Sequence, residues 1–178
     1  MVIFRKSKGV SPIISYILVV LLIFAGLSVV LTIGMPVLDR SRQVASFQRA
    51  QEDLLSLDSK IREVSSYGRG TLAEFSLSTD HGTYNFVPAN DTFYYEVETD
   101  AEIISPGAHR RLGAVNMSGR EHDGSNLVKL ELDYSDENIN LTEMRGRNEV
   151  SFSSGYYTLV LDNKGVENGK VRIDVGIR

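Results

Sequence analysis

The residues that could ligate a metal ion or transfer a proton are three histidines and one acidic cluster. His81, His109 and His122 stand in turn-like or loop contexts, without the HxxxH or HExxH spacing that places two imidazoles on one helix face. The acidic cluster offers the hard oxygen ligands that Ca²⁺ prefers, but it lacks the glycine and the spacing of an EF-hand loop; it consists of Asp133, Asp136 and Glu137. We interpret both sets as solvated side chains.

Motifs for nucleophilic catalysis and phosphate binding are absent from the sequence. The chain has no cysteine, no serine in a G-x-S-x-G turn and no G-x-G-x-x-G or G-x-x-x-x-G-K-[ST] loop. The absence of cysteine also excludes a disulfide framework. We therefore expect a non-enzymatic protein without a cofactor or a metal. A membrane-anchored hydrolase is the weakest alternative, because it would need a polar site that the sequence does not show.

Covalent modification is the chemistry that the sequence does offer. Three N-x-[ST] sequons begin at Asn90, Asn116 and Asn140, in or beside predicted loops, where a glycosyltransferase could reach them. We treat these asparagines as candidate glycosylation sites. The alternative is that some or all of them stay unmodified.

The elements that would place the sequons outside the cell begin with an apolar segment near the N-terminus. Residues 13–33 form a run of 21 residues without a charge, 15 of which are Ile, Leu, Val or Phe. As a helix this run spans roughly 31 Å, about the thickness of the hydrocarbon core of a bilayer. At about −0.3 to −0.6 kcal/mol per large aliphatic residue, its insertion is favoured by about 4 to 9 kcal/mol. We expect a single-pass protein of the cell membrane.

A cationic leader, residues 1–9, precedes the apolar run and contains Arg5, Lys6 and Lys8. Positive charges of this kind hold the N-terminus in the cytoplasm, so the C-terminal domain is expected outside the cell. A secretory signal peptide would have a shorter apolar run and a small-residue cleavage site, and this sequence has neither. Removing the leader would take the net charge from −4 to −7, which argues against nucleic acid as a partner.

The sequence KGVSP at positions 8–12, directly before the apolar run, resembles the class III signal peptide of archaeal type IV pilin-like proteins. The resemblance covers residues 5–38 and implies that a prepilin-type peptidase cuts between Gly9 and Val10, after the basic residue Lys8. It also implies that residues 10–38 stay on the mature protein as a transmembrane helix that can form the core of a filament. The acidic residue of the bacterial pattern, five positions into the mature helix, is replaced here by Ile14.

The function that this resemblance implies is that of a cell-surface structural subunit, or an accessory component, of an archaeal type IV pilus-type filament with a role in assembly or adhesion. Its partners would be the lipid bilayer, the peptidase and like or related pilin subunits. A protein of a different class remains open: a membrane-anchored ectodomain that never polymerises and acts as a binding module. The two alternatives differ at the bond between Gly9 and Val10, which stays intact in the second.

Residues 39–70 are predicted to form an amphipathic helix and a hinge. Apolar residues recur at spacings of three and four, as on one face of a helix; they are Phe47, Ala50, Leu54, Leu57, Ile61 and Val64. We favour the interpretation that this stripe packs on the protein's own β-domain. The alternative is that it also packs against neighbouring subunits, with Phe47, Leu54, Leu57, Ile61 and Val64 as the candidate subunit-packing residues. Gly34 and Pro36 predict an interruption before the stripe, and the Gly68-Arg69-Gly70 sequence predicts its end.

From residue 71 the apolar period changes to two, as in β-strands. About eight short segments separated by turn residues predict an antiparallel β-sandwich-like head over residues 71–178. Positions 79–82 and 163–165 are expected to be turns between strands, and residues 107–119 a loop. Alternation also predicts that one tyrosine of the Tyr156-Tyr157 pair points away from the core. The expected fold class is α+β, a long transmembrane and amphipathic helix followed by the head.

We expect the native protein to carry glycan on at least one of the three sequons, because all three lie in the part predicted outside the cell. Intact-mass measurement of protein from native membranes should give a mass above that of the polypeptide. Replacing each sequon asparagine by Gln should remove the added mass in steps. A native mass equal to that of the polypeptide would exclude glycosylation.

Overall fold

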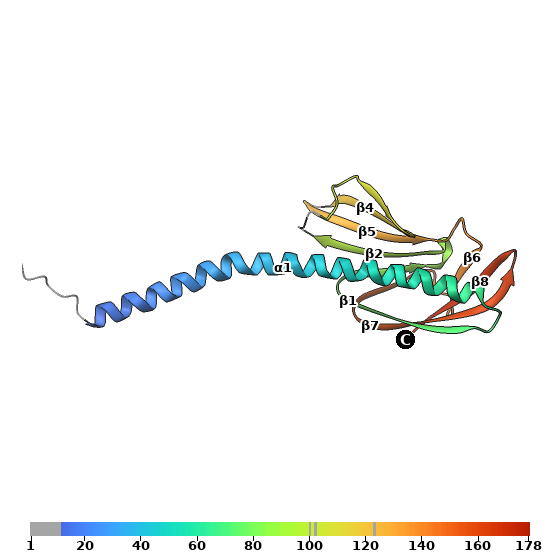
Figure 1. The fold of residues 1–178 in the computed structure, drawn as a ribbon, viewed down its shortest axis with the longest axis horizontal. Coiled ribbons are helices and arrows are strands. Elements are labelled where there is room, and N and C mark those ends of the chain that lie inside the picture. The colour runs from blue at the N-terminus through green and yellow to red at the C-terminus, as the bar shows by residue number, and fades with distance from the viewer. Residues whose placement is uncertain (1–11, 100, 102, 123) are drawn as a thin grey trace, which may run out of the picture. The chain divides into compact units, whose positions relative to one another are not determined.

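The structure of the chain, a computed structural model, describes residues 12–99, 101, 103–122 and 124–178. The chain divides into two compact units, Met1–Asp39 and Arg40–Arg178. One helix, α1 (Pro12–Ser66), supplies the described part of the first unit and the first element of the second (Figure 1). We call the second unit the head.

Helix α1 passes through Gly34 and Pro36 as a single element. The interruption predicted at these residues therefore does not end the helix, although the proline ring removes one backbone donor there. The helix ends at Ser66, directly before the glycines that were expected to terminate it. Gly70 has a φ of +89°, in the left-handed region that glycine adopts without a steric cost.

Within the described residues, the head contains eight strands in one sheet, with the order β3-β4-β5-β2-β1-β7-β8-β6. The strands are β1 (Leu72–Val87), β2 (Thr92–Thr99), β3 (His109–Leu112), β4 (Val115–His122), β5 (Ser125–Asp133), β6 (Ile139–Glu143), β7 (Val150–Glu167) and β8 (Lys170–Ile177), and a short 3-10 helix, η1 (Pro88–Asn90), links β1 to β2. The α+β class with a long N-terminal helix is confirmed. The head is a single mixed sheet in place of the predicted antiparallel sandwich, since β6 pairs with β8 in parallel.

Three strand boundaries differ from the prediction. Strand β1 continues through positions 79–82, where its pairing with β7 only shifts register. Strand β7 continues through positions 163–165, again with a register shift, and its hairpin with β8 turns beyond Glu167. The stretch 107–119, predicted as a loop, contains β3 and the first part of β4. Turn-forming residues in this head therefore mark irregularities inside long strands as well as true turns.

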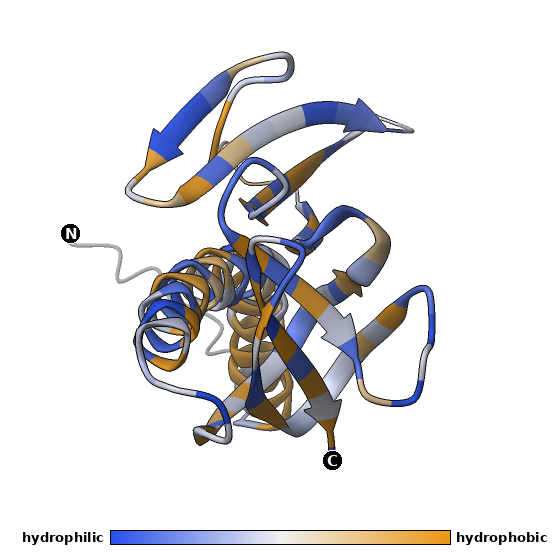
Figure 2. Cartoon of the chain, turned by 90° about the vertical axis from the view of Figure 1, so that its right-hand side faces the viewer, coloured by the Kyte–Doolittle hydropathy of each residue, from blue (hydrophilic) through white to orange (hydrophobic). Residues whose placement is uncertain are grey.

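One face of the sheet, which we call the inner face, shares a core with α1. Its strands alternate apolar and polar residues, which Figure 2 shows as short orange and blue bands. The predicted stripe of α1 is buried in this core, with exposed fractions of 5% or less; it comprises Phe47, Ala50, Leu54, Leu57, Ile61 and Val64. Cross-strand ring pairs add to the core, and the rings of Phe86 and Phe93 stack with centroids 4.2 Å apart. Packing on the protein's own β-domain, the favoured interpretation of the stripe, is confirmed.

Polar contacts fix the position of α1 along the sheet. The hydroxyl of Tyr84 donates to Asp53 at 3.1 Å, and the hydroxyl of Tyr134 donates to Asp58 at 2.9 Å. Burial raises the pKa of both tyrosines and of Asp53. The guanidinium of Arg62 bridges Asp58 to Glu137 across the same seam. These hydrogen bonds are directional, so they select one register of the helix among those that the apolar stripe would allow.

The C-terminal end of α1 is held by Asn163 of β7, whose side chain is buried. Its Nδ2 donates to the carbonyls of Val64 and Tyr67 at 2.7 and 2.9 Å, and its Oδ1 accepts from the amide of Gly165 at 2.8 Å. Carbonyls of the last helical turn have no partner within the helix, so a side chain from the sheet satisfies them here. This role explains why β7 continues through a position that reads as a turn in the sequence.

We expect Asn163→Ala to lower the stability of the head by about 1–3 kcal/mol, because two carbonyls at the end of α1 lose their donor. The change should appear as a lower thermal midpoint, followed by circular dichroism of the purified chain in detergent. Asn148→Ala is the matched control, since Asn148 is exposed and makes no hydrogen bond that the structure describes. Equal midpoints for the two variants would contradict the role assigned to Asn163.

Candidate functional site

The first part of α1 has the properties of a membrane anchor. It is the one helix in the described part of the chain that is long and apolar enough to cross a bilayer. Nearly all its large apolar side chains, from Ile13 to Leu38, are 48–73% exposed, so no protein core of this chain covers them. This arrangement fits a single-pass anchor.

Two of the hydroxyl groups within this segment are satisfied by the helix itself. Ser28 donates to the carbonyl of Phe24 at 2.9 Å, and Thr32 donates to the carbonyl of Ser28 at 2.7 Å. A hydroxyl that bonds back to its own helix can face hydrocarbon without an unpaired donor. Ser28 and Thr32 therefore do not oppose insertion.

The predicted processing site, Lys8, Gly9 and Val10, lies outside the described residues. Cleavage by a prepilin-type peptidase therefore stays a prediction from the sequence. The five candidate subunit-packing residues, by contrast, are described, and all five lie in the head's own core; they are Phe47, Leu54, Leu57, Ile61 and Val64. They have almost no surface left for a second subunit, so packing between subunits at this level would have to use the opposite side of α1.

All three sequon asparagines have exposed side chains. Asn90 ends η1, as expected for a loop position, whereas Asn116 lies within β4 and Asn140 within the edge strand β6. The hydroxyl residues two positions on are more enclosed, and Thr142 donates to Asp174 at 2.6 Å. Exposure makes each asparagine accessible to a transferase, and the glycosylation itself stays a prediction.

The residues considered for metal binding or acid–base chemistry do not converge. His81, His109 and His122 are exposed, and they belong to three different strands. Glu137 of the acidic cluster is engaged by Arg62. Among the described residues, no group of three or more histidine or acidic side chains could hold a metal ion. The structure thus gives these residues no shared site.

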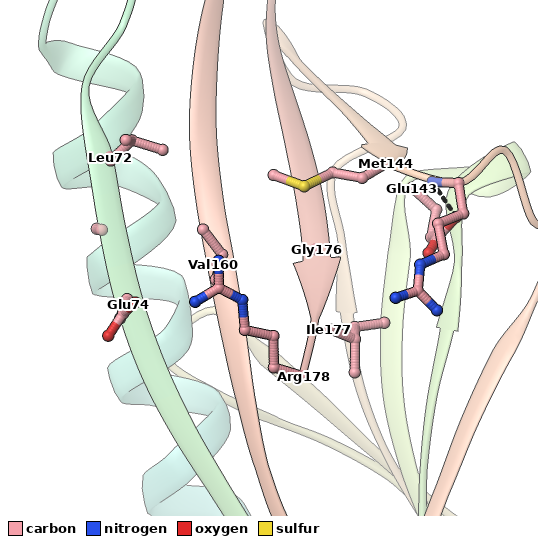
Figure 3. Close-up of a pocket in the computed structure, with 10 residues that line it drawn as sticks. Leu72, Glu74, Glu143, Met144, Val160, Gly176, Ile177 and Arg178 are labelled. Carbon is pink, nitrogen blue, oxygen red and sulfur yellow. Dashed lines mark hydrogen bonds between the residues drawn. The ribbon is translucent and has the colours of Figure 1, made fainter.

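A groove lies on the face of the sheet opposite α1, which we call the outer face. It has a volume of about 580 Å³ and is lined by segments from β1, β7 and β8 and from the start of the β6–β7 loop. Leu72, Val160 and Met144 provide its apolar surface (Figure 3). The volume lies within the range of small-molecule and side-chain binding pockets.

The shape of the groove depends on Gly176. Met144 lies against this glycine, because a Cβ atom there would stand 2.5 Å from Met144 Sδ. The charged side chains of Glu74 and Arg178 lie beside the apolar surface (Figure 3), and Arg145 also lines the groove. None of the three forms an ion pair within the part of the chain that the structure describes. The groove therefore combines an apolar floor with charged groups that are free to bind a partner.

Glu143 fixes the wall of the groove. Its side chain is 1% exposed, accepts from the Arg147 guanidinium at 2.7 Å, and accepts from the backbone amides of Arg145 and Arg147. Burial acts to raise the pKa of this carboxyl, but the hydrogen bonds from Arg147 and Arg145 outweigh it, so the pKa lies below its ordinary value. The ionised carboxylate thus holds the segment that carries Met144 and Arg145.

No pattern in the sequence predicted this groove, because its lining comes from four segments that are distant along the chain. An exposed tyrosine on the same face was predicted by alternation, and the structure confirms it: Tyr156 is 90% exposed, whereas Tyr157 packs against the core. Compared with known protein families, with curated proteins and with solved structures, the chain gives no match. The function must therefore be inferred from the anchor, the head and the groove.

We expect Glu143→Gln to destabilise the head by about 1–3 kcal/mol at neutral pH, because charge-assisted hydrogen bonds are lost. The pKa of Glu143 is lower in the folded state, so its contribution is present above the unfolded pKa, about 4.3, and is lost as the pH falls through the folded value. The difference between wild type and variant should therefore shrink in acid. Thermal midpoints between pH 3 and 7 measure this, with Glu121→Gln, at an exposed position, as the control. A difference independent of pH would contradict the role of the ionised carboxylate.

Proposed function

We propose that this chain is a pilin-like cell-surface subunit, anchored in the membrane by the first part of α1 and able to enter a filament after cleavage between Gly9 and Val10. The observation that carries the proposal is the double role of α1. Its N-terminal part exposes apolar side chains on all sides, and its C-terminal part is the buried spine of the head. A head built directly on its anchor helix cannot separate from it without losing its own core.

The apolar segment would serve in two environments. In the membrane its side chains contact lipid, and in a filament they would contact the same segments of neighbouring subunits, which replaces lipid by protein at a similar polarity. Small residues such as Gly26 and Ala25 allow helices to approach closely. The cationic leader would keep the N-terminus in the cytoplasm until it is removed, with the head outside.

The head is proposed as the outward-facing part of the subunit. The head carries the three exposed sequon asparagines, two in strands and Asn90 in η1, and its outer face carries the groove. A role in adhesion or in contacts between subunits fits such a surface better than catalysis, since the described residues bring no acid, base and nucleophile together. The alternative is the anchored binding module. A chain that keeps its leader and stays monomeric would support that alternative and refute this proposal.

We expect protein from native membranes to begin at Val10, measured by N-terminal sequencing. Gly9→Leu should abolish the cut, because a bulky side chain replaces the small residue before the bond, and should also abolish filaments seen by electron microscopy. Gly26→Leu is the matched control: it lies inside the apolar run, its Cβ would meet open space, and cleavage should persist. A wild-type protein that keeps Met1 or begins at Val2 would refute the pilin-like proposal.

A further inference from the structure

Tyr156 is the most exposed large hydrophobic side chain among the described residues of the head, at 90%. It makes no hydrogen bond or ring contact within the described residues, and its strand neighbour Tyr157 takes the place in the core. Gly155, with a φ of +151°, precedes it at the register shift between β1 and β7. Tyrosine is among the residues that most often anchor protein contacts, because a large rigid ring is buried at a low entropic cost.

Tyr156 and the groove lie on the same strand and the same face. Val160 on the groove floor follows Tyr156 by four residues, so the two side chains point the same way, about 13 Å apart. Thr158 stands midway between them. On the β1 side small side chains flank this stretch, since Ser78 pairs with Tyr156 and Ser76 with Thr158; on the β8 side Arg178 lies beside Thr158. A projecting ring and a receiving groove are thus joined by a flat surface.

This arrangement is self-complementary. Consider a two-fold axis that lies above Thr158, parallel to the sheet and perpendicular to its strands. A second head related by this axis would face the outer face of the first, and the two β7 strands would run antiparallel. Tyr156 of each copy would then stand over Val160 and the groove of the other. In such an isologous contact each ring of Tyr156 occupies the groove of the other copy, so both rings and both grooves are filled.

We propose that the occupant of the groove is Tyr156 of a second copy of this chain, and that two heads pair through their outer faces. The ring would contact Leu72, Val160 and Met144, whose sulfur favours aromatic partners. The phenol hydroxyl would meet Glu74 or the guanidinium of Arg178 or Arg145, which have no ion pair in the described part of the chain.

Arg178 is the group that this contact must accommodate. Its backbone exchanges hydrogen bonds with Thr158, so the two copies of Arg178 would approach near the axis. In the structure the side chain of Arg178 extends away from Thr158 and toward Val160 (Figure 3). In that direction the guanidinium lies beside the groove that receives the partner's ring, where a cation can contact the ring face or the hydroxyl.

The pairing does not depend on cleavage at Gly9 or on a filament, so it can be tested on the uncut full chain in detergent, at fewer than one chain per micelle. The chain has no cysteine, which allows single thiols to be introduced. In the paired heads the two Thr158 Cα atoms would be about 10 Å apart, the spacing of face-packed sheets. That is too far for a disulfide but within reach of a short bismaleimide.

With Thr158→Cys, we expect at least ten times more cross-linked dimer than with Ser59→Cys. The control thiol is exposed, whereas Thr158 is half-buried, so accessibility alone would favour the control; Ser59 lies on α1, on the opposite side of the sheet. This control also measures dimers that form through the anchor alone. Cross-linking of Thr158→Cys no greater than that of Ser59→Cys would overturn the proposal.

Two further substitutions in the Thr158→Cys chain test the ring and the groove separately. Tyr156→Ala removes the ring and Leu72→Glu places a charge at the groove; both positions are more than half exposed, so the thermal midpoint should not change. Each variant alone should lose about tenfold in cross-linked dimer. A mixture of the two should recover an intermediate yield, because one ring and one intact groove remain.

Loss of dimer in both variants without recovery in the mixture would overturn the reciprocal contact, as would unchanged cross-linking in Tyr156→Ala. A monomeric wild-type chain that retains a small amphiphile or a peptide in native mass spectrometry would assign the groove to that occupant and refute the pairing. Cleavage at Gly9 is measured separately by N-terminal sequencing. Failure of the pairing would therefore leave the proposed function standing, and absence of cleavage would leave the pairing standing.

Discussion

The burial of one side of α1 against the inner face of the sheet is the interaction on which the rest of the structure depends. Without the helix, the inner face would expose a continuous apolar surface that includes Phe86, Phe93 and Leu161. Without the sheet, the second part of α1 would be a polar helix with one unsatisfied apolar stripe. The polar seam made by Asp53, Asp58 and Arg62 then selects the register in which the two fit.

The two parts of α1 therefore suit different surroundings, and the pattern of apolar residues differs between them. Between residues 13 and 33 apolar side chains occupy all sides, and the hydroxyls of Ser28 and Thr32 bond back to the helix. Between residues 47 and 64 apolar residues occupy one side only, and the other carries charges that water can solvate. No family or structural relative identifies the chain, so this change of pattern along one helix is the main physical support for reading it as an anchored surface subunit.

Local patterns predicted what local physics determines. The three-and-four spacing from Phe47 to Val64 found the buried side of α1, and alternation found the exposed Tyr156. Strands β3 and β4 were missed because glycines and charged residues dilute the alternation there, and only Val115, Met117 and Gly119 are buried in those strands. The parallel pairing of β6 with β8, the outer-face groove and the use of Asn163 as a helix cap each join segments far apart in the chain, which no window of sequence contains.

Asn163 also has a mechanical consequence for a protein held by its N-terminal helix. Within the head, a pull on α1 acts along the axis of residues 40–66, parallel to the buried stripe. The apolar contacts, the Tyr84 and Tyr134 hydrogen bonds and the amide of Asn163 at the far end are then loaded together, in shear. Contacts that share a load resist more force than contacts that open one after another. In the surface subunit that we propose, this shared loading would resist drag on the head.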